Sequence, residues 1–108
     1  MEWAAKNRNV LVAFARSYKR GVRWLYDPAN KDAAIDILVR HARQDRNDTV
    51  QAYDYLVERL KLFSLDGGIS DTAYDKMAEG LIDLGDMKQP VPPKSLILDG
   101  SFVEQAIN

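Results

Sequence analysis

The sequence of 108 residues contains no cysteine, a single histidine and four prolines. The lack of cysteine excludes a disulfide scaffold, a thiolate metal site and a cysteine nucleophile. No run of about 18 apolar residues occurs, so no segment is expected to span a membrane. The formal net charge is -1. A dedicated nucleic-acid binder usually carries a strong basic excess, so we expect no nucleic-acid partner.

Apolar residues, which make up 46% of the chain, recur at spacings of three and four in four segments. This periodicity is typical of amphipathic helices that place one apolar face on a core. The expected helices cover residues 7–26, 30–43 and 47–63 and a fourth segment between Ser70 and Gly85.

Residues that favour helix ends flank these segments. The expected N-caps are Asn7, Asn30, Asn47 or Asp48, and Ser70. The first helix should end at Asp27-Pro28, because a residue that precedes proline is pushed out of the α region. Gly85 should follow the fourth helix in a left-handed conformation, which costs glycine little.

The last twenty residues differ from the rest of the chain. Residues 89–93 contain three prolines and must be extended. Residues 96–98 could form a short strand or an apolar extended arm, and Ser101 should cap a last helix that runs through Ile107. The predicted fold is all-α, with four amphipathic helices, a Pro-rich extended arm and a short C-terminal helix. We expect a single domain, with a helical body at 1–88 and the arm and last helix at 89–108.

Charge is divided unequally between the two ends of the chain. Residues 1–46 hold ten Lys and Arg against five Asp and Glu, and residues 47–108 hold five against eleven. The two parts therefore carry +5 and -6. A basic row at Arg16, Arg20 and Arg23 could be a solvated face or could pair with the acidic fourth helix, within one chain or between chains. Weak nucleic-acid binding through this row is a third interpretation, which predicts a steep salt dependence.

The residue types that carry chemistry do not form a recognisable site. His41 has no partner at the spacing of a metal or catalytic motif. An acidic row lies on one face of the fourth helix, which is usually the solvated face, and comprises Asp71, Asp75, Glu79 and Asp83. No glycine-rich phosphate loop occurs. We therefore expect no enzymatic activity, no catalytic residue, no metal site and no cofactor.

Aromatic side chains are the more informative class. At helical spacing they are core residues by default. Trp24 and Tyr55, however, lie off the main apolar stripes, where they could cover a neighbouring lobe, a partner or a ligand. Together with Tyr18 they are the candidate partner-contact residues.

One stretch is specific enough to suggest a family. Residues 22–35 read VRWLYDPANKDAAI. They resemble the C-terminal part of ABC-transporter periplasmic substrate-binding proteins of the nitrate/sulfonate/taurine and thiamine-precursor type. Further similar landmarks follow in the same order over nearly the whole chain: WAAKNR at 3–8, YD at 53–54, FSLDGGI at 63–69, PVPP at 90–93, and DGSFV at 99–103 with Ala106.

The resemblance implies that the chain is a helical fragment of a two-lobed α/β binding protein. Such a fragment would be a partial solute-binding component, binding a small organic or anionic solute only if a missing lobe completed it. Its implied partners are that solute and a membrane permease, and no ligand-binding residue can be carried over from the family. The implied location is the periplasm. Residues 1–8 lack the apolar region of a signal peptide, so the chain expressed as given is expected in the cytoplasm.

An alternative needs no missing lobe. The chain could be a stand-alone helical interaction module that self-associates into a homo-oligomer. Its aromatic residues off the core and its two oppositely charged parts would then meet between copies.

Overall fold

The computed structural model describes residues 2–106, which form seven α-helices and no strand, and the predicted all-α class is confirmed. The α-helices are α1 (Glu2–Lys6), α2 (Arg8–Tyr26), α3 (Lys31–Ala42), α4 (Arg46–Tyr53), α5 (Asp71–Asp83), α6 (Lys94–Ile97) and α7 (Ser101–Gln105). A 3₁₀ turn, η1 (Pro28–Asn30), joins α2 to α3, and a π-helical segment, η2 (Asp54–Arg59), continues α4. The expected helix end at Ile107 lies outside the described residues.

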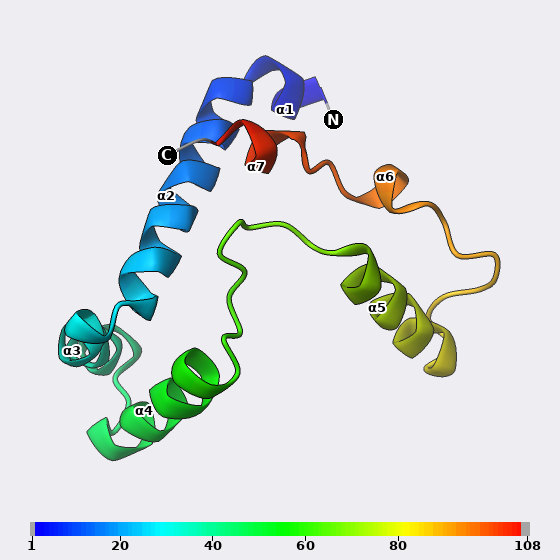
Figure 1. The fold of residues 1–108 in the computed structure, drawn as a ribbon. Coiled ribbons are helices and arrows are strands. Elements are labelled where there is room, and N and C mark those ends of the chain that lie inside the picture. Colours follow the sequence, from blue (N-terminus) through cyan, green and yellow to red (C-terminus); the bar gives the residue numbers. More distant parts are fainter. Residues whose placement is uncertain (1, 107–108) are drawn as a thin grey trace.

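The helices are arranged as an open ring (Figure 1). The chain runs down α2, through α3 and α4, across to α5, and back to α2 through α6 and α7. The radius of gyration is 17.1 Å. A compact domain of this length has a radius of gyration of about 13 Å. The described chain therefore leaves more of its surface open to solvent than a compact domain does.

The buried core lies at one side of the ring, where α2, α3, α4 and η2 meet; we call these four elements the body. Its buried side chains are Ala34, Ile35, Tyr53 and Val57, with Leu25, Tyr26, Val39 and Val50 packed against them. Each comes from the apolar stripe of its own helix, because residues three and four apart share a helix face. Within residues 2–106, no helix is both long and apolar enough to cross a membrane.

Only part of the apolar stripe expected on the first helix is buried. Val22 is buried, whereas Val10 and Phe14 are 51% and 71% exposed. The N-terminal part of α2 extends beyond the buried core, and α7 covers only a short length of its apolar stripe. Arg8 holds α7 there by donating to the Ser101 hydroxyl over 2.9 Å and to the Gln105 side chain over 3.0 Å.

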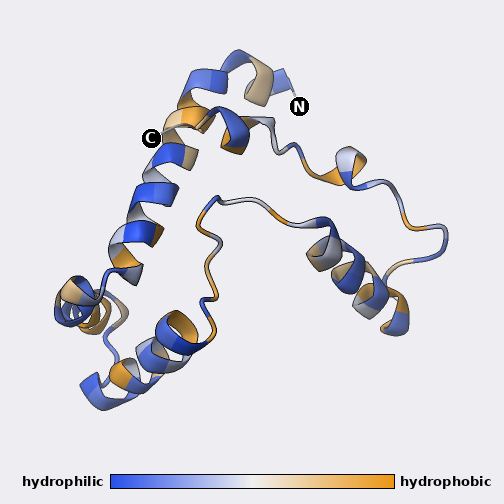
Figure 2. Ribbon diagram, viewed as in Figure 1, coloured by the Kyte–Doolittle hydropathy of each residue, from blue (hydrophilic) through white to orange (hydrophobic). Residues whose placement is uncertain are grey.

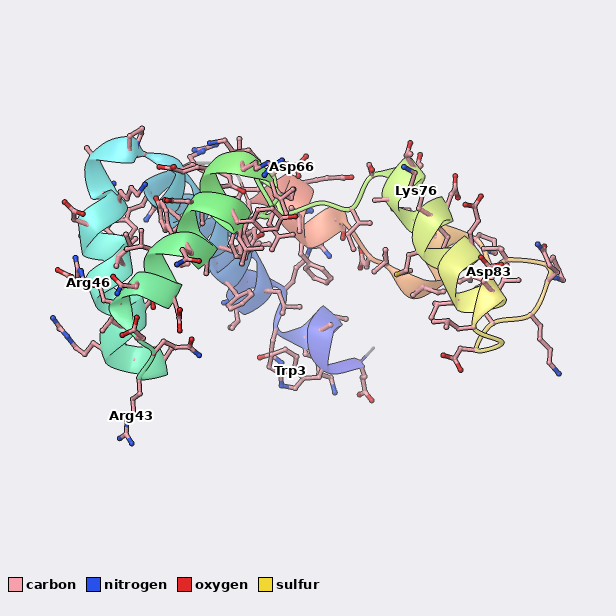
Figure 3. All side chains as sticks on the ribbon, turned by 90° about the horizontal axis from the view of Figure 1, so that it is seen from below. Trp3, Arg43, Arg46, Asp66, Lys76 and Asp83 are labelled. Carbon is pink, nitrogen blue, oxygen red and sulfur yellow. The ribbon has the colours of Figure 1, made fainter. Side chains whose placement is uncertain are left out.

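We call residues 71–106 the C-terminal segment; its last helix, α7, packs on α2 of the body, whereas α5 lies apart from the body. Tyr74 and Ala78 of α5 are buried, and the Tyr74 hydroxyl donates to the Pro92 carbonyl over 2.7 Å. This contact and the views in Figures 1 and 3 place α5 against the extended arm rather than beside another long helix. In Figure 2, orange apolar residues are scattered along this segment between blue and white ones.

Three of the predicted helix ends are confirmed: the stop at Asp27-Pro28, the cap at Ser70 and the left-handed Gly85. The Ser70 hydroxyl accepts the Ala73 amide, and Gly85 has a φ of 81°.

Asn7 and Asn30 occupy the expected N-cap positions but do not cap through their side chains, and the cap expected at Asn47 or Asp48 is wrong. The side-chain amides of Asn7 and Asn30 instead donate backward to the carbonyls of Trp3 and Trp24. Asp45, rather than Asn47 or Asp48, caps α4 by accepting two amides of the first turn. The expected cap at Ser101 is also wrong, because Gly100 precedes α7 and Ser101 is its first helical residue.

Two further expectations are wrong in detail. Residues 96–98 form neither a strand nor a fully extended arm, because Lys94–Ile97 is a single helical turn that follows Pro93. The third helix stops being α-helical at Asp54 and ends at Arg59, before the expected Phe63. The wider π turn bonds each amide five residues back and so shifts the helical register. Leu60, expected on the buried face, is 48% exposed as a result.

Candidate functional site

The hollow of the body with the most apolar lining is a groove of about 360 Å³ between α3, α4 and the end of α2. We call it the apolar groove. It is lined by Trp24, Leu25, Ala34, Ile37, Leu38, Ala42, Gln44, Thr49, Ala52, Tyr53, Leu56, Val57 and Phe63. Eleven of these thirteen residues are apolar or aromatic. An apolar concavity of this kind is suited to another apolar surface rather than to ionic chemistry.

The groove has a buried floor and exposed walls. Tyr53, Val57 and Ala34 form the floor, each at most 5% exposed. The walls are large side chains that the chain itself does not cover, namely Trp24, Ile37, Leu38, Leu56 and Phe63, all between 36% and 45% exposed. The floor is therefore part of the core, and the walls form an apolar surface that is exposed to solvent.

Hydrogen bonds at the joint of α2 and α3 fix Trp24 on the wall. The Trp24 carbonyl accepts the Asn30 amide group at 3.0 Å, and the Asp27 carboxylate accepts the Ala29 backbone amide at 3.0 Å. The buried Tyr53 hydroxyl donates to the Leu25 carbonyl over 2.6 Å. The bonds to the Trp24 and Leu25 carbonyls satisfy groups that the last turn of α2 leaves unpaired, and the Asp27 carboxylate caps η1. The end of α2 is thereby held against the floor of the groove.

A second pair of bonds fixes Phe63 on the opposite wall. The Tyr26 hydroxyl donates to the Phe63 carbonyl over 2.6 Å and accepts the Phe63 amide at 2.7 Å. The Lys61 ammonium lies 4.9 Å from the centroid of the Tyr26 ring, within cation–π distance. The connector that follows η2 is therefore fixed at the groove.

Ion pairs hold α3 against α4 and η2. The Lys31 ammonium lies 2.6 Å from an Asp54 oxygen and 3.1 Å from a Glu58 oxygen. The hydrogen bonds to Asp54 and then Glu58 raise the pKa of Lys31 above its ordinary value. Arg46 pairs with Asp36 on the other side. The two pairings join the elements that form the groove. None of the paired residues belongs to the lining of the groove.

The three predicted partner-contact residues do not form one surface. Trp24 lies on the wall of the apolar groove. Tyr18 lies in a different hollow, of about 270 Å³, between α2 and α7. Tyr55 is 51% exposed on η2, with the Arg59 guanidinium 5.7 Å from its ring centroid. The structure thus brings only Trp24 to the candidate site.

Sequence patterns did not identify the other groove walls. Leu38 and Leu56 belong to predicted apolar stripes, whose residues were expected to be buried. The signal for an uncovered wall lies on α3, where Ala34, Ile35, Ile37, Leu38 and Val39 are all apolar. Such a row spans a wider arc of the helix than one neighbour can cover.

A more polar hollow of about 310 Å³ lies inside the ring, between residues 66–69 and 94–104. Both lysines that line it have partners. Lys19 donates to the carbonyls of Val103 and Ala106, over 2.8 and 3.2 Å, and Lys94 donates to the Ile69 carbonyl and to Asp71. Within the described residues, both cations that line this hollow are therefore already engaged by protein groups.

Among residues 2–106, no group of three or more histidine, aspartate or glutamate side chains is placed to hold a metal ion. The acidic row of α5 is exposed, and its first member, Asp71, pairs with Lys94 at 2.8 Å. That pairing lowers the pKa of Asp71 below its ordinary value.

Comparisons with protein-family models, curated proteins and solved structures found no match.

Proposed function

We propose that this chain is a helical component of the solute-binding protein of an ABC transport system, which binds a small organic or anionic solute only when a second lobe completes it. The uncovered apolar groove carries the proposal, because it offers a separate lobe a surface on which to pack. The resemblance of residues 22–35 to that family supports the choice of partner.

The resembling residues act as a joint in this structure. Asp27 and Asn30 use their side chains to connect the end of α2 to η1, and Tyr53 bonds the last turn of α2. These groups are engaged within the chain, as are Lys19 and Lys94 of the polar hollow. We therefore infer that the second lobe supplies most of the solute contacts, and that this chain supplies the support on which that lobe closes.

Calorimetry tests this proposal. The chain, alone and mixed with the separately purified N-terminal lobe of a sulfonate-binding protein, is titrated with a sulfonate, nitrate and a pyrimidine. We expect solute heats only from the mixture, and their loss in the groove variant Trp24→Asp. Failure of the lobe to bind the chain would overturn the proposal. Tight solute binding by the chain alone would refute the need for a second lobe.

A second candidate function, self-association, is favoured by the exposed area. The accessible surface is 8267 Å² for a chain of 12.2 kDa. A compact protein of that mass exposes about 6,100 Å², so the excess is about 2,200 Å². A standard interface buries about 800 Å² on each partner. The excess is large enough for such an interface, and a second copy of the chain could supply the other side.

Sedimentation velocity from low to high micromolar concentration tests self-association. We expect a concentration-dependent shift from monomer to dimer. A strict monomer at the highest concentration would exclude this second function and leave the solute-binding proposal to be decided by calorimetry.

A further inference from the structure

The most distinctive uncovered helix is α5. Its buried side chains, Tyr74 and Ala78, face the extended arm. Figure 3 shows the helix, with Lys76 and Asp83, at the opposite end of the molecule from the part of the body that carries Arg43 and Arg46. Most of the surface of α5 is therefore available to another molecule.

A row of small and apolar residues runs along the exposed side of α5. Ala73, Met77, Gly80 and Leu84 follow one another at spacings of four, three and four, and all four are exposed. Met77 and Leu84 are 44% and 76% exposed. Residues at such spacings share one helix face. The helix thus presents a second apolar face, distinct from the one that Tyr74 and Ala78 bury.

The charges of α5 and α2 are complementary. α5 contains four acidic residues and one lysine, whereas α2 contains five basic residues and no acidic one. Arg20 lies one helical turn before Trp24, on the same face of α2 as this groove residue. Arg23 and Phe63 line a common hollow beside the groove. The groove therefore has a basic margin, and the exposed apolar row of α5 has an acidic one at Glu79 and Asp83.

Contacts on both sides of α5 keep it from its own groove. The backbone of Gly67 lies so close to Tyr18 and Val103 that a Cβ atom built there would lie 3.3 Å from each. Gly68, Ile69 and Ser70 alone separate Gly67 from α5, a reach of about 14 Å. Lys94 ties the start of α5 to the arm through the Ile69 carbonyl and Asp71. Docking onto the same chain would break these contacts, whereas docking onto another copy breaks none.

We propose that α5 of one copy docks in the apolar groove of a second copy, with Glu79 and Asp83 beside Arg20 and Arg23, and that the second copy returns the contact. This inference rests on the second proposed function, self-association, and names its surfaces. Reciprocal exchange gives a closed, two-fold dimer that leaves neither groove open. Direct pairing of two grooves is disfavoured, because it would bring two strongly basic α2 helices together.

The test is a charge exchange followed by sedimentation velocity. The variants Arg20→Glu/Arg23→Glu and Glu79→Arg/Asp83→Arg are each expected to be monomeric, because like charges then meet at both contacts. An equimolar mixture is expected to form a heterodimer, in which opposite charges meet at both contacts. Formation of the heterodimer also shows that both variants are folded.

Apolar variants supply a second measurement. Leu84→Asp and Trp24→Ala should each weaken dimerisation by about thirtyfold, the usual effect of losing a central interface residue. The matched control is Phe14→Asp, an exposed apolar residue on α2 outside the groove, which should leave dimerisation unchanged. Circular dichroism confirms that the variants retain their helices.

Each outcome decides the inference. A wild-type chain that stays monomeric overturns both the inference and self-association. A dimer that survives all the α5 variants overturns the inference alone and points to direct pairing of other surfaces. Single charge variants that dimerise like the wild type, or a mixture that stays monomeric, also overturn the exchange.

Discussion

The body and the C-terminal segment are both helical, but different interactions hold them. The body encloses a small core around Ile35, which is 2% exposed. The C-terminal segment buries few side chains, and polar groups that donate to backbone carbonyls fasten it, as Lys19, Tyr74 and Lys94 do. Helical sequence patterns look alike in both regions. The stability of a helix in a protein nevertheless comes mainly from what it packs against.

The largest expected change in the free energy of unfolding distinguishes a core residue from a residue of the groove wall. Ile35→Ala should lower the free energy of unfolding of the body by about 3 kcal/mol, through lost burial and the cavity left behind. Ile37→Ala, two residues away on the exposed wall, should cost less than about 1 kcal/mol. Urea denaturation at low micromolar concentration measures both. Equal losses would show that the groove wall is packed as tightly as the core.

A smaller effect is expected at the joint of α2 and α3. Tyr53→Phe removes the hydroxyl that donates to the Leu25 carbonyl over 2.6 Å. Because that carbonyl loses a buried partner, we expect a loss of about 1 to 2 kcal/mol in the same denaturation experiment. Tyr55→Phe is the matched control on the exposed side of η2, with an expected change within about 0.5 kcal/mol. An unchanged free energy of unfolding in Tyr53→Phe would contradict a stabilising role of this bond.

Loss of a contact between α7 and α2 should have a smaller effect, which is confined to α7. Lys19→Met removes the donor to the Val103 and Ala106 carbonyls. We expect about 1 kcal/mol less protection of the α7 amides, the scale of a hydrogen bond, with little change in the body. Hydrogen exchange measures this difference. Arg20→Met, on the next residue, should leave the protection unchanged, and unchanged exchange in Lys19→Met would refute the attachment.

The smallest effect is expected from pH at the start of α5. Lys94 lowers the pKa of Asp71 below its ordinary value. A lowered folded-state pKa means that the pairing stabilises the segment above the unfolded-state pKa, near 4 for aspartate, and is lost as pH falls through the lower folded value. Carboxyl titration by nuclear magnetic resonance should show the Asp71 pKa rising towards its ordinary value in Lys94→Met. An unchanged pKa in that variant would exclude the pairing.

Much of the fold follows from local rules. Ser70 caps a helix because its hydroxyl reaches an amide of the first turn, and Gly85 ends that helix because glycine adopts a positive φ readily. Asn7 and Asn30 satisfy the same local rules yet bond backward to earlier carbonyls. An asparagine can bond to either side of a helix junction, and only the assembled joint decides between the two.

The groove was less predictable than the helices. The sequence pattern indicates Trp24 as a contact residue, because it lies off an apolar stripe. Phe63, however, reaches the groove only because Tyr26 holds its backbone from 37 residues earlier in the chain. The π turn that moves Leu60 out of the core likewise has no local signature in the sequence. Tyr18 and Tyr55 could not be assigned to separate surfaces before the path of the chain was known.

The packing of α7 on α2 also bears on the order in which parts of the chain fold. Arg8 and Ser101 are 93 residues apart in the chain. Bringing the ends of such a loop together costs about 4 kcal/mol of chain entropy, which the contacts of α7 alone offset poorly. Contacts this distant form late, after local helices and the α3–α4 pairing have shortened the effective loop. The ring is therefore expected to close last on folding and to open first on unfolding. Contact between α2 and α7 thus indicates that the helices between them have already folded.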